Sequence, residues 1–249
     1  MSRRSVVVST LLILLVWEAV ARLANVDVLP PASVVLLEFA KGMPGDLGRH
    51  FLISTWRVVA SIVLTVVLAT PAGLAIGQSP TWNRRLSALI YLTYPIPKVV
   101  FLPIILLFLG IGDASKIFLI WLILFYQVLL VVRDASAGVH PDLVQSVASL
   151  GSSRLQLLRY VFFPACLPAI LTGLRVSVGT AIAVLFLAES IATSSGLGYY
   201  IMVDGWGRLD YAAMYAGVVA MSLLGLALYA LLERAERLAC PWTAIRATA

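Results

Sequence analysis

Charged side chains are scarce in this sequence of 249 residues, of which only 12% are charged and 61% are hydrophobic. A soluble domain of ordinary composition carries about a quarter charged residues. The mean hydropathy is +0.99, so the chain has too little polar side-chain surface to cover a water-soluble globule. An integral membrane protein is therefore predicted. In a membrane protein, basic residues mainly record which side of the bilayer a loop faces. The net charge of +6 is therefore not evidence of nucleic-acid binding.

Cysteine and histidine are also scarce, with two of each in the whole chain. Cys166 and Cys240 lack the spacing of a disulfide framework or a metal site, and two ordinary thiols are the better interpretation. His50 and His140 form no HExxH motif and are interpreted as ordinary loop histidines. The sequence therefore predicts no metal site and no catalytic residue.

Lysine occurs only at positions 41, 98 and 116, and in no case does it follow a glycine. A P-loop requires a glycine-rich turn that ends in Gly-Lys-Ser or Gly-Lys-Thr, because its backbone amides and its lysine hold the phosphates. The chain therefore cannot hydrolyse ATP by that route, and no cofactor is predicted on it. If its activity is driven by ATP, the ATPase is another polypeptide.

Long apolar runs dominate the rest of the sequence. A helix needs about 20 apolar residues to cross the hydrocarbon core of a bilayer, and six segments of the chain meet this need. The prediction is one all-α membrane domain over residues 1–249, with a third span interrupted by prolines. The six predicted spans cover residues 6–23, 58–76, 86–109, 117–132, 170–188 and 211–232.

The first segment allows a second interpretation. Arg3 and Arg4 precede an apolar stretch, and Ala19–Ala21 reads AVA, which is the pattern of a cleaved signal peptide. Cleavage there would leave five spans and would move one terminus across the membrane.

The distribution of Lys and Arg predicts the orientation of the chain. With the N-terminus inside, ten of these residues, Arg246 among them, fall in inner segments and six fall in outer segments. The positive-inside rule therefore favours a cytoplasmic N-terminus and a cytoplasmic C-terminus. In this topology the longest cytoplasmic connection covers residues 133–168.

That connection contains the polar stretch "SLGSSRLQLLRYVFFPACLPAILTGLR" at residues 149–175. Its pattern predicts two short helices over residues 142–163, separated at Gly151, because glycine tolerates the left-handed conformation that ends helices. Ser152 or Ser153 is expected to cap the second helix. Pro164 and Pro168 are expected to stop it before the next span begins.

The second short helix is predicted to be amphipathic, since Gly151, Leu155, Leu158 and Phe162 fall on one face. Two interpretations fit this pattern. The helix could lie on the bilayer surface as an interfacial helix, or it could dock onto a cytoplasmic partner.

The stretch "VQSVASLGSSRLQLLRYVFFPACLPAILTGLR" resembles the EAA loop of the permease subunits of binding-protein-dependent ABC importers. Gly151 matches the glycine of that loop, and Phe163–Pro164 occupies its leucine-proline position. The three residues at 145–147 replace the Glu-Ala-Ala, so a specific contact from an acidic residue is not expected. The blocks "HFLISTWRVVAS", "YPIPKVVFLPIILLFLGIGDASK" and "LAESIATSSGLGYYI" resemble other parts of the same family, in the same order.

The resemblance implies a type I importer permease of six transmembrane helices, in the cytoplasmic (inner) membrane of a bacterium. It is similar to the branch for sulfonates, taurine, nitrate and thiamine precursors, which implies a small anionic or heteroaromatic solute. The implied partners are a second permease copy, two ATPase subunits that bind ATP and Mg, and an extracytoplasmic substrate-binding protein. The ATPase-docking residues implied by the resemblance are Gln145, Ser146, Val147, Leu150, Gly151, Ser152, Arg154, Leu155, Leu158, Arg159 and Pro164.

Two charged residues are candidates for the translocation pathway. Lys98 lies in the proline-broken span, where a lysine either faces a water-filled pathway or snorkels to the headgroups. Glu189 ends the fifth predicted span, and an interfacial carboxylate is favoured there over a pathway role.

Two runs of small residues predict close packing of helices. Gly73 and Gly77 form a GxxxG pattern, and Gly173, Ser177 and Ala181 form a ridge in the fifth span. Such ridges let helix backbones approach closely, and packing within one chain is expected here.

Two rival functions are weighed against the importer. A membrane-embedded enzyme would need a catalytic constellation inside the spans, which hold almost no acids and no histidine. An ion-coupled secondary carrier is the alternative, but such carriers usually have more spans and buried carboxylates for coupling.

Overall fold

The structure is a computed structural model that describes residues 3–191 and 193–242. Within those ranges every regular element is a helix, which confirms the predicted all-α class. Arg246, one of the basic residues in the orientation count, lies outside the described residues. Five helical stretches are long and apolar enough to cross a membrane. They are α1 (Arg3–Ala24), α3 (Asp46–Gln78), α6 (Asp113–Ala137), the stretch Arg154–Ser190 that contains α9 (Phe163–Ser190), and α11 (Tyr211–Ala239).

A bent pair of helices is the candidate for the sixth predicted span. α4 (Pro80–Thr93) and the stretch Lys98–Leu109 meet at an angle of 75°. That stretch consists of a 3-10 turn, η1 (Lys98–Phe101), and α5 (Leu102–Leu109). The break falls at Pro95 and Pro97, where proline removes backbone donors and disfavours helix in the residue before it.

The remaining elements are short. Two of them are π-helical turns: η2 leads into α9, and η3 lies between the short elements α10 and η4. The short elements are α2 (Ala32–Gly42), α7 (Pro141–Ala148), α8 (Arg154–Leu157), η2 (Leu158–Phe162), α10 (Leu197–Tyr199), η3 (Tyr200–Gly205) and η4 (Trp206–Arg208).

The chain folds as two compact units, each of which is described by itself. Unit 1 contains residues 1–56 and 186–224, and unit 2 contains residues 57–185 and 225–249. By these bounds α3, α9 and α11 each contribute to both units.

In unit 1, α1 contacts α2. Glu18 on α1 accepts hydrogen bonds from the Ser33 amide at 2.9 Å and from Arg22 Nε at 2.7 Å. The carboxylate therefore binds the first turn of α2, where the helix dipole favours a negative charge. Trp17 of α1 lies against Tyr215 of α11, with ring centroids 5.7 Å apart.

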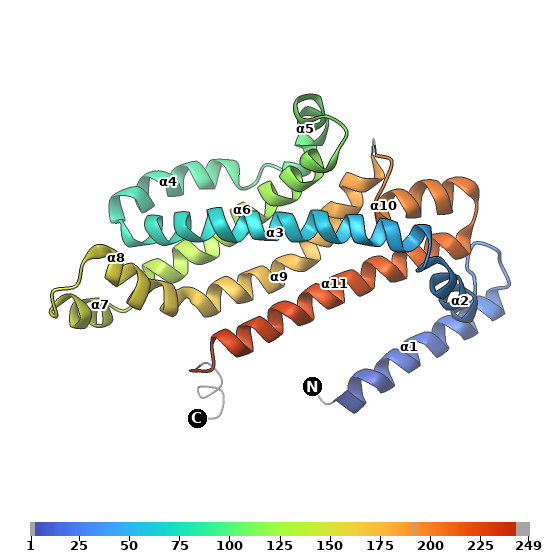
Figure 1. Cartoon of the computed structure of the whole chain (residues 1–249), viewed down its shortest axis with the longest axis horizontal. Helices are drawn as coiled ribbons and strands as arrows, with labels where there is room; N and C mark the ends of the chain where they lie inside the picture. The colour runs from blue at the N-terminus through green and yellow to red at the C-terminus, as the bar shows by residue number, and fades with distance from the viewer. Residues whose placement is uncertain (1–2, 192, 243–249) are drawn as a thin grey trace. The chain divides into compact units, whose positions relative to one another are not determined.

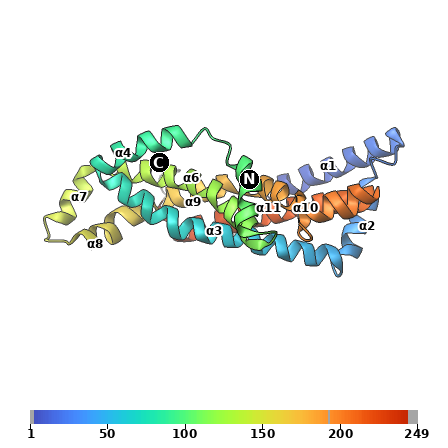
Figure 2. The ribbon, with the colours of Figure 1, turned by 90° about the horizontal axis from the view of Figure 1, so that it is seen from above.

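In unit 2, α3, α6 and α9 run side by side (Figures 1 and 2). Small residues account for this close packing. A Cβ atom on Gly73 would lie 2.8 Å from Val132 Cβ, and one on Gly77 would lie 2.6 Å from Ser136 Cβ. The predicted packing of the GxxxG pattern within one chain is confirmed. The apolar cluster that these helices share with α4 consists of Ala69, Leu74, Ile90, Val128, Leu129, Val132, Cys166, Ile170 and Leu174.

Two arginines inside unit 2 form ion pairs. Arg57 is 2% exposed, and its Nη2 lies 2.7 Å from Asp113 Oδ1 at the start of α6. Arg175 Nη1 lies 3.1 Å from Glu236 Oε2, and Thr172 Oγ1 donates to the other oxygen of Glu236 at 2.8 Å. Charges within membrane helices are costly unless they are paired, so these contacts allow the arginines to lie within apolar helices.

The prediction that Pro164 and Pro168 stop the second short helix is wrong. α8, η2 and α9 form one helical stretch over Arg154–Ser190. In η2 the amide of Phe163 donates to the carbonyl of Leu158, one residue further back than in an α-helix. This wider turn directly precedes Pro164, where it makes room for the ring and replaces the usual bonding pattern. Pro168 lies inside α9. The connection between α6 and this long helical stretch is therefore shorter than the predicted loop 133–168.

Candidate functional site

The α7–α8 segment, residues 141–157, is the first candidate site. Figures 1 and 2 show it at one end of unit 2, beyond the ends of the neighbouring helices of that unit. Gly151 has a φ of +76° and lies between the two helices, which confirms the predicted break at this residue. A Cβ atom on Gly151 would meet nothing within 4 Å, so the requirement for glycine here comes from the backbone conformation alone.

The cap of α8 is a reciprocal pair of hydrogen bonds. Ser153 Oγ accepts from the amide of Gln156, and Gln156 Oε1 accepts from the amide of Ser153 at 2.7 Å. This is a capping box, which satisfies two otherwise unpaired amides at the helix start. Of the two predicted serines, Ser153 is therefore the cap. Ser152 instead donates to the carbonyl of Val147 at 2.9 Å and so ties the turn back onto α7.

The predicted apolar face of the second helix is divided. Leu158 packs with Phe162 against the apolar cluster of unit 2. Leu155, in the first turn of the helix, is 72% exposed, so the other helices of the chain do not cover it. Leu143 and Leu150 are exposed too; these two residues and Leu155 are called the leucine patch.

The other predicted docking residues lie in the same segment or in the helical stretch that follows it. Gln145 and Ser146 of α7 are exposed, as are Arg154 and Arg159 on the following helix. Val147 and Pro164 are half-buried. The segment therefore presents apolar and basic side chains together on its outer surface.

Lys98 forms the second candidate site, at the break in the bent span. Its Nζ donates to the carbonyls of Thr93 at 3.0 Å and Tyr94 at 2.7 Å. These carbonyls belong to the C-terminal end of α4, where the helix dipole favours a cation. The ammonium also lies over two aromatic rings, 5.2 Å from the centroid of Tyr94 and 4.5 Å from that of Tyr126.

The ammonium borders a cleft of about 360 Å³, called the Lys98 cleft. Gln127 and Thr180 also line this cleft, and Gln127 Nε2 donates to Thr180 Oγ1 at 3.4 Å. The Oε1 atom of Gln127 is buried and has no hydrogen-bond partner among the described residues. A neighbouring cavity of about 600 Å³ shares Tyr94, Gln127 and Thr180 with this cleft.

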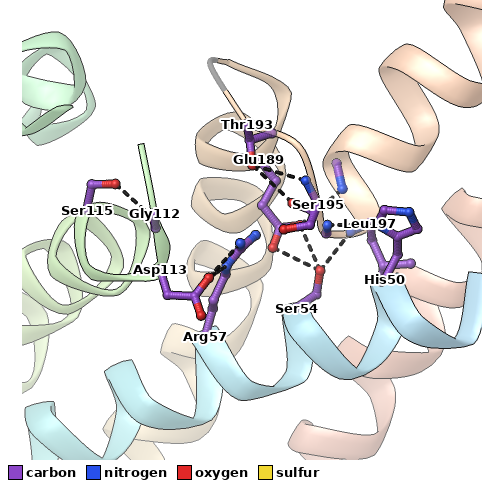
Figure 3. Close-up of polar contacts among 12 residues, drawn as sticks. His50, Ser54, Arg57, Gly112, Asp113, Ser115, Glu189, Thr193, Ser195 and Leu197 are labelled. Carbon is purple, nitrogen blue, oxygen red and sulfur yellow. Dashed lines mark hydrogen bonds and ion pairs between the residues drawn. The ribbon is translucent and has the colours of Figure 1, made fainter. Parts of the chain in front are cut away.

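Glu189 lies at the centre of the third candidate site, which is within unit 1 (Figure 3). The carboxylate is fully buried. Its two oxygens lie 2.9 and 2.7 Å from Ser54 Oγ, and Oε2 also accepts from the amide of Gly198 at 3.1 Å. Ser54 Oγ accepts in turn from the amide of Leu197 at 2.8 Å, and His50 Nδ1 accepts from the amide of Gly196 at 2.9 Å.

These contacts cap the helical stretch that begins at Leu197. The first amides of a helix have no partner within the helix, and here side chains of α3 and α9 accept from three successive amides. Glycine is required at two of these positions. A Cβ atom on Gly196, where φ is +110°, would overlap the carboxylate of Glu189, and one on Gly198 would lie 2.6 Å from Glu189 Cβ.

Two predictions are therefore wrong. Glu189 is not an interfacial carboxylate, because the loop that follows α9 folds over it and supplies amide donors. His50 is not a loop histidine, because α3 begins at Asp46 and buries it. Its Nε2 lies 3.9 Å from Asp204 Oδ2. His50 and Ser54 are four residues apart and so share one face of α3. Their common role as acceptors for backbone amides could have been predicted only if the start of α3 had been placed correctly.

Comparison with known proteins identifies relatives for most of the chain. The family model for the binding-protein-dependent transport system inner membrane component matches residues 66–239. The taurine transport system permease protein TauC of Escherichia coli is 35% identical over 94% of this chain and 88% of its own length. The putative aliphatic sulfonates transport permease protein SsuC of Bacillus subtilis is 29% identical over 92% of this chain and 84% of its own.

A solved structure has a similar fold. An inward-facing structure of the MetNI methionine ABC transporter contains a chain that superposes with a TM-score of 0.64. The match covers 78% of this chain and 96% of the other, with 19% sequence identity. The likeness shows that the helices of this chain follow the permease fold of an ABC importer.

Proposed function

The chain belongs to the family of binding-protein-dependent transport system inner membrane components, and from this membership we propose how its parts act in import. It is a permease subunit that contributes the translocation pathway of an ABC importer, and ATP is hydrolysed on a partner ATPase. The predicted family, fold and non-catalytic role are confirmed, and the alternative of an ion-coupled secondary carrier is set aside.

The α7–α8 segment is proposed as the docking element for the ATPase. The leucine patch carries this proposal, because its three residues are exposed by 55% (Leu143 of α7), 84% (Leu150 of the turn before Gly151) and 72% (Leu155 of α8). Burial of a leucine that is otherwise in water contributes about 1.5–3 kcal/mol, so a groove that covers the patch would bind it firmly. Arg154 is next to Leu155 in the chain and Arg159 follows it by four residues; both are exposed and suit an acidic rim.

Continuity of the helix supports a role in coupling. α8 leads through η2 into α9 without a loop, and Leu158 and Phe162 anchor the junction on the apolar cluster of unit 2. A shift of the docked end is therefore expected to move α9 directly, since a helix transmits displacement along its axis.

The proposed assembly contains two copies of this permease, two ATPase subunits and one extracytoplasmic binding protein. ATP and Mg are held by the ATPase subunits. The assembly requires the α7–α8 segment to face the cytoplasm, which agrees with the distribution of Lys and Arg. With six spans, this orientation puts the N-terminus and the C-terminus in the cytoplasm. The proposed location is the bacterial cytoplasmic (inner) membrane.

The proposed solute is small and anionic. Two relatives are named for transport of taurine and of aliphatic sulfonates, both of which carry a sulfonate group. A heteroaromatic solute is the second candidate, because a further relative is named for formylaminopyrimidine transport.

Docking is tested by co-purification of the permease with its ATPase. The paired change Leu150→Asp and Leu155→Asp should leave membrane insertion intact, lower ATPase recovery at least tenfold, and abolish hydrolysis that the loaded binding protein stimulates. Leu238→Asp is the matched control, because Leu238 is 83% exposed and lies outside the patch. Full ATPase recovery by the paired variant would show that the segment is an interfacial helix.

A further inference from the structure

The Lys98 cleft is lined by a positive charge and by Gln127, and neither has a role in the proposed docking of the α7–α8 segment to the ATPase. We propose that this cleft binds the anionic group of the solute as it passes through the membrane domain. The inference rests on the proposed function, since it assumes import of a small anionic solute, and it names the residues that would hold that solute.

The ammonium of Lys98 is positioned to receive an anion. A lysine ammonium has three N–H donors, and two of them are used by the carbonyls of Thr93 and Tyr94. These bonds hold Nζ at the wall of the cleft and leave the third donor for a ligand. A lysine in an apolar span usually faces protein or a water-filled cavity rather than lipid, which agrees with a cleft open to solutes.

The walls of the cleft suit a short organic ion. The rings of Tyr94 and Tyr126 both lie close to the ammonium and offer flat surfaces to an alkyl chain. The volume of about 360 Å³ holds a solute of a few carbon atoms together with hydrating water. The neighbouring cavity of about 600 Å³ continues along α9 past Thr172, Gly173 and Val176, which gives the solute a route away from the cleft.

Gln127 supplies a second polar group. Its amide nitrogen is engaged by Thr180, whereas its buried Oε1 has no partner among the described residues. Gln127 and Thr180 both line the cleft, so this polar pair lies beside a solute whose sulfonate group binds Lys98.

The competing explanation is that Lys98 reaches the lipid headgroups and binds no solute. The two explanations predict different results for a thiol placed in the cleft. Only solute binding predicts that the thiol reacts preferentially with an anionic reagent and that a sulfonate protects it from modification. Ile96 lines the cleft and its side chain is apolar and exposed, so Ile96→Cys places a reporter thiol there at small cost. The native thiols Cys166 and Cys240 are buried.

The experiment measures thiol modification in the assembled permease–ATPase complex in lipid nanodiscs. Two reagents of similar size are compared, the anionic 2-sulfonatoethyl methanethiosulfonate and the cationic 2-(trimethylammonio)ethyl methanethiosulfonate. A Gly207→Cys variant, in an exposed turn of unit 1, calibrates the intrinsic reactivity of the two reagents, and the chain without an added cysteine gives the background.

The ratio of the anionic to the cationic labelling rate should be about tenfold higher at Ile96→Cys than at Gly207→Cys. The reason is that a fixed charge in a cleft raises the local concentration of its counter-ion. Excess taurine or ethanesulfonate should slow the reaction several-fold. Lys98→Met should abolish both effects, and Lys98→Arg should retain the charge preference. Absence of a charge preference, or of protection by both sulfonates, with Lys98 intact would overturn the inference without reliance on any Lys98 variant.

Uptake measurements separate this inference from the proposed function. With the binding protein and ATP present, Lys98→Met should lower sulfonate uptake about tenfold, whereas Lys98→Arg should retain most of it. Lys41→Met, on an exposed lysine of α2, should leave uptake unchanged. If the unmodified complex imports no sulfonate, the proposed solute class is wrong, and the labelling assay still decides whether the cleft binds anions.

Discussion

Ser54 and Glu189 are bound to one another across 135 residues of sequence, with Ser54 Oγ at 2.9 and 2.7 Å from the two carboxylate oxygens. Both residues are fully buried. The serine hydroxyl also accepts from the amide of Leu197, so a single oxygen connects α3, the end of α9 and the start of α10. The pair therefore fixes the segment that follows the fifth span.

Ser54→Ala should destabilise the protein. The change removes a donor to a buried carboxylate and leaves the amide of Leu197 without its acceptor, and each such loss costs about 1–3 kcal/mol. Thermal unfolding in detergent should show a lower midpoint. Ser222→Ala is the control, because Ser222 is exposed and bonds only to a carbonyl of its own helix; equal midpoints for the two variants would contradict this account of Ser54.

Gly198→Ala should be more damaging than an alanine at an open glycine. The added Cβ would lie 2.6 Å from Glu189 Cβ and 2.7 Å from the carbonyl oxygen of Phe186, and a backbone atom cannot move aside cheaply. Gly179→Ala, at an exposed helical position with nothing within 4 Å, should be neutral or stabilising by up to about 1 kcal/mol. Comparison of the yield and unfolding midpoint of the two variants checks this, and an equal loss in both would refute it.

Much of the α7–α8 segment could be predicted from sequence because its determinants are local. Glycine at a left-handed turn and serine at a helix start depend on a few neighbouring residues. The continuation of the helix through Pro164 could not be predicted in this way. It depends on the π-helical turn η2, which is stabilised by the packing of Leu158 and Phe162 on residues far away in the chain.

The Glu189 site was missed for the same reason. Its acceptors come from α3 and α9, and its donors are backbone amides. Backbone amides cannot be recognised from a sequence, so Gly196 and Gly198 are the remaining sequence signal for this site. The position of Leu155 shows a further limit, since helical periodicity predicts which residues share a face but not where the neighbouring helices end. For Lys98, the sequence indicated a charge in a broken span, but the cleft beside it was visible only in the structure.

Substitutions at Gly151 should separate its backbone conformation from its small size. The φ of +76° disfavours a β-branched side chain strongly, whereas Asn tolerates this region. Gly151→Val should therefore lower ATPase co-purification and stimulated hydrolysis several-fold, and Gly151→Asn should retain most of both. Membrane insertion should be normal in each variant. Equal retention of the ATPase by the two variants would show that the turn at Gly151 is not needed for docking.

The orientation of the chain gives the last prediction. If the leucine patch binds a cytoplasmic ATPase, a thiol on α7 must be accessible only from the cytoplasm. Ser146→Cys, at an exposed position of α7, should be labelled by a membrane-impermeant maleimide in inverted vesicles but not in intact spheroplasts. Gly207→Cys should show the opposite pattern, because one membrane span, α9, separates η4 from the α7–α8 segment. Labelling of Ser146→Cys in intact spheroplasts would place the patch outside the cell and exclude its contact with the ATPase, whatever the chemistry of its leucines.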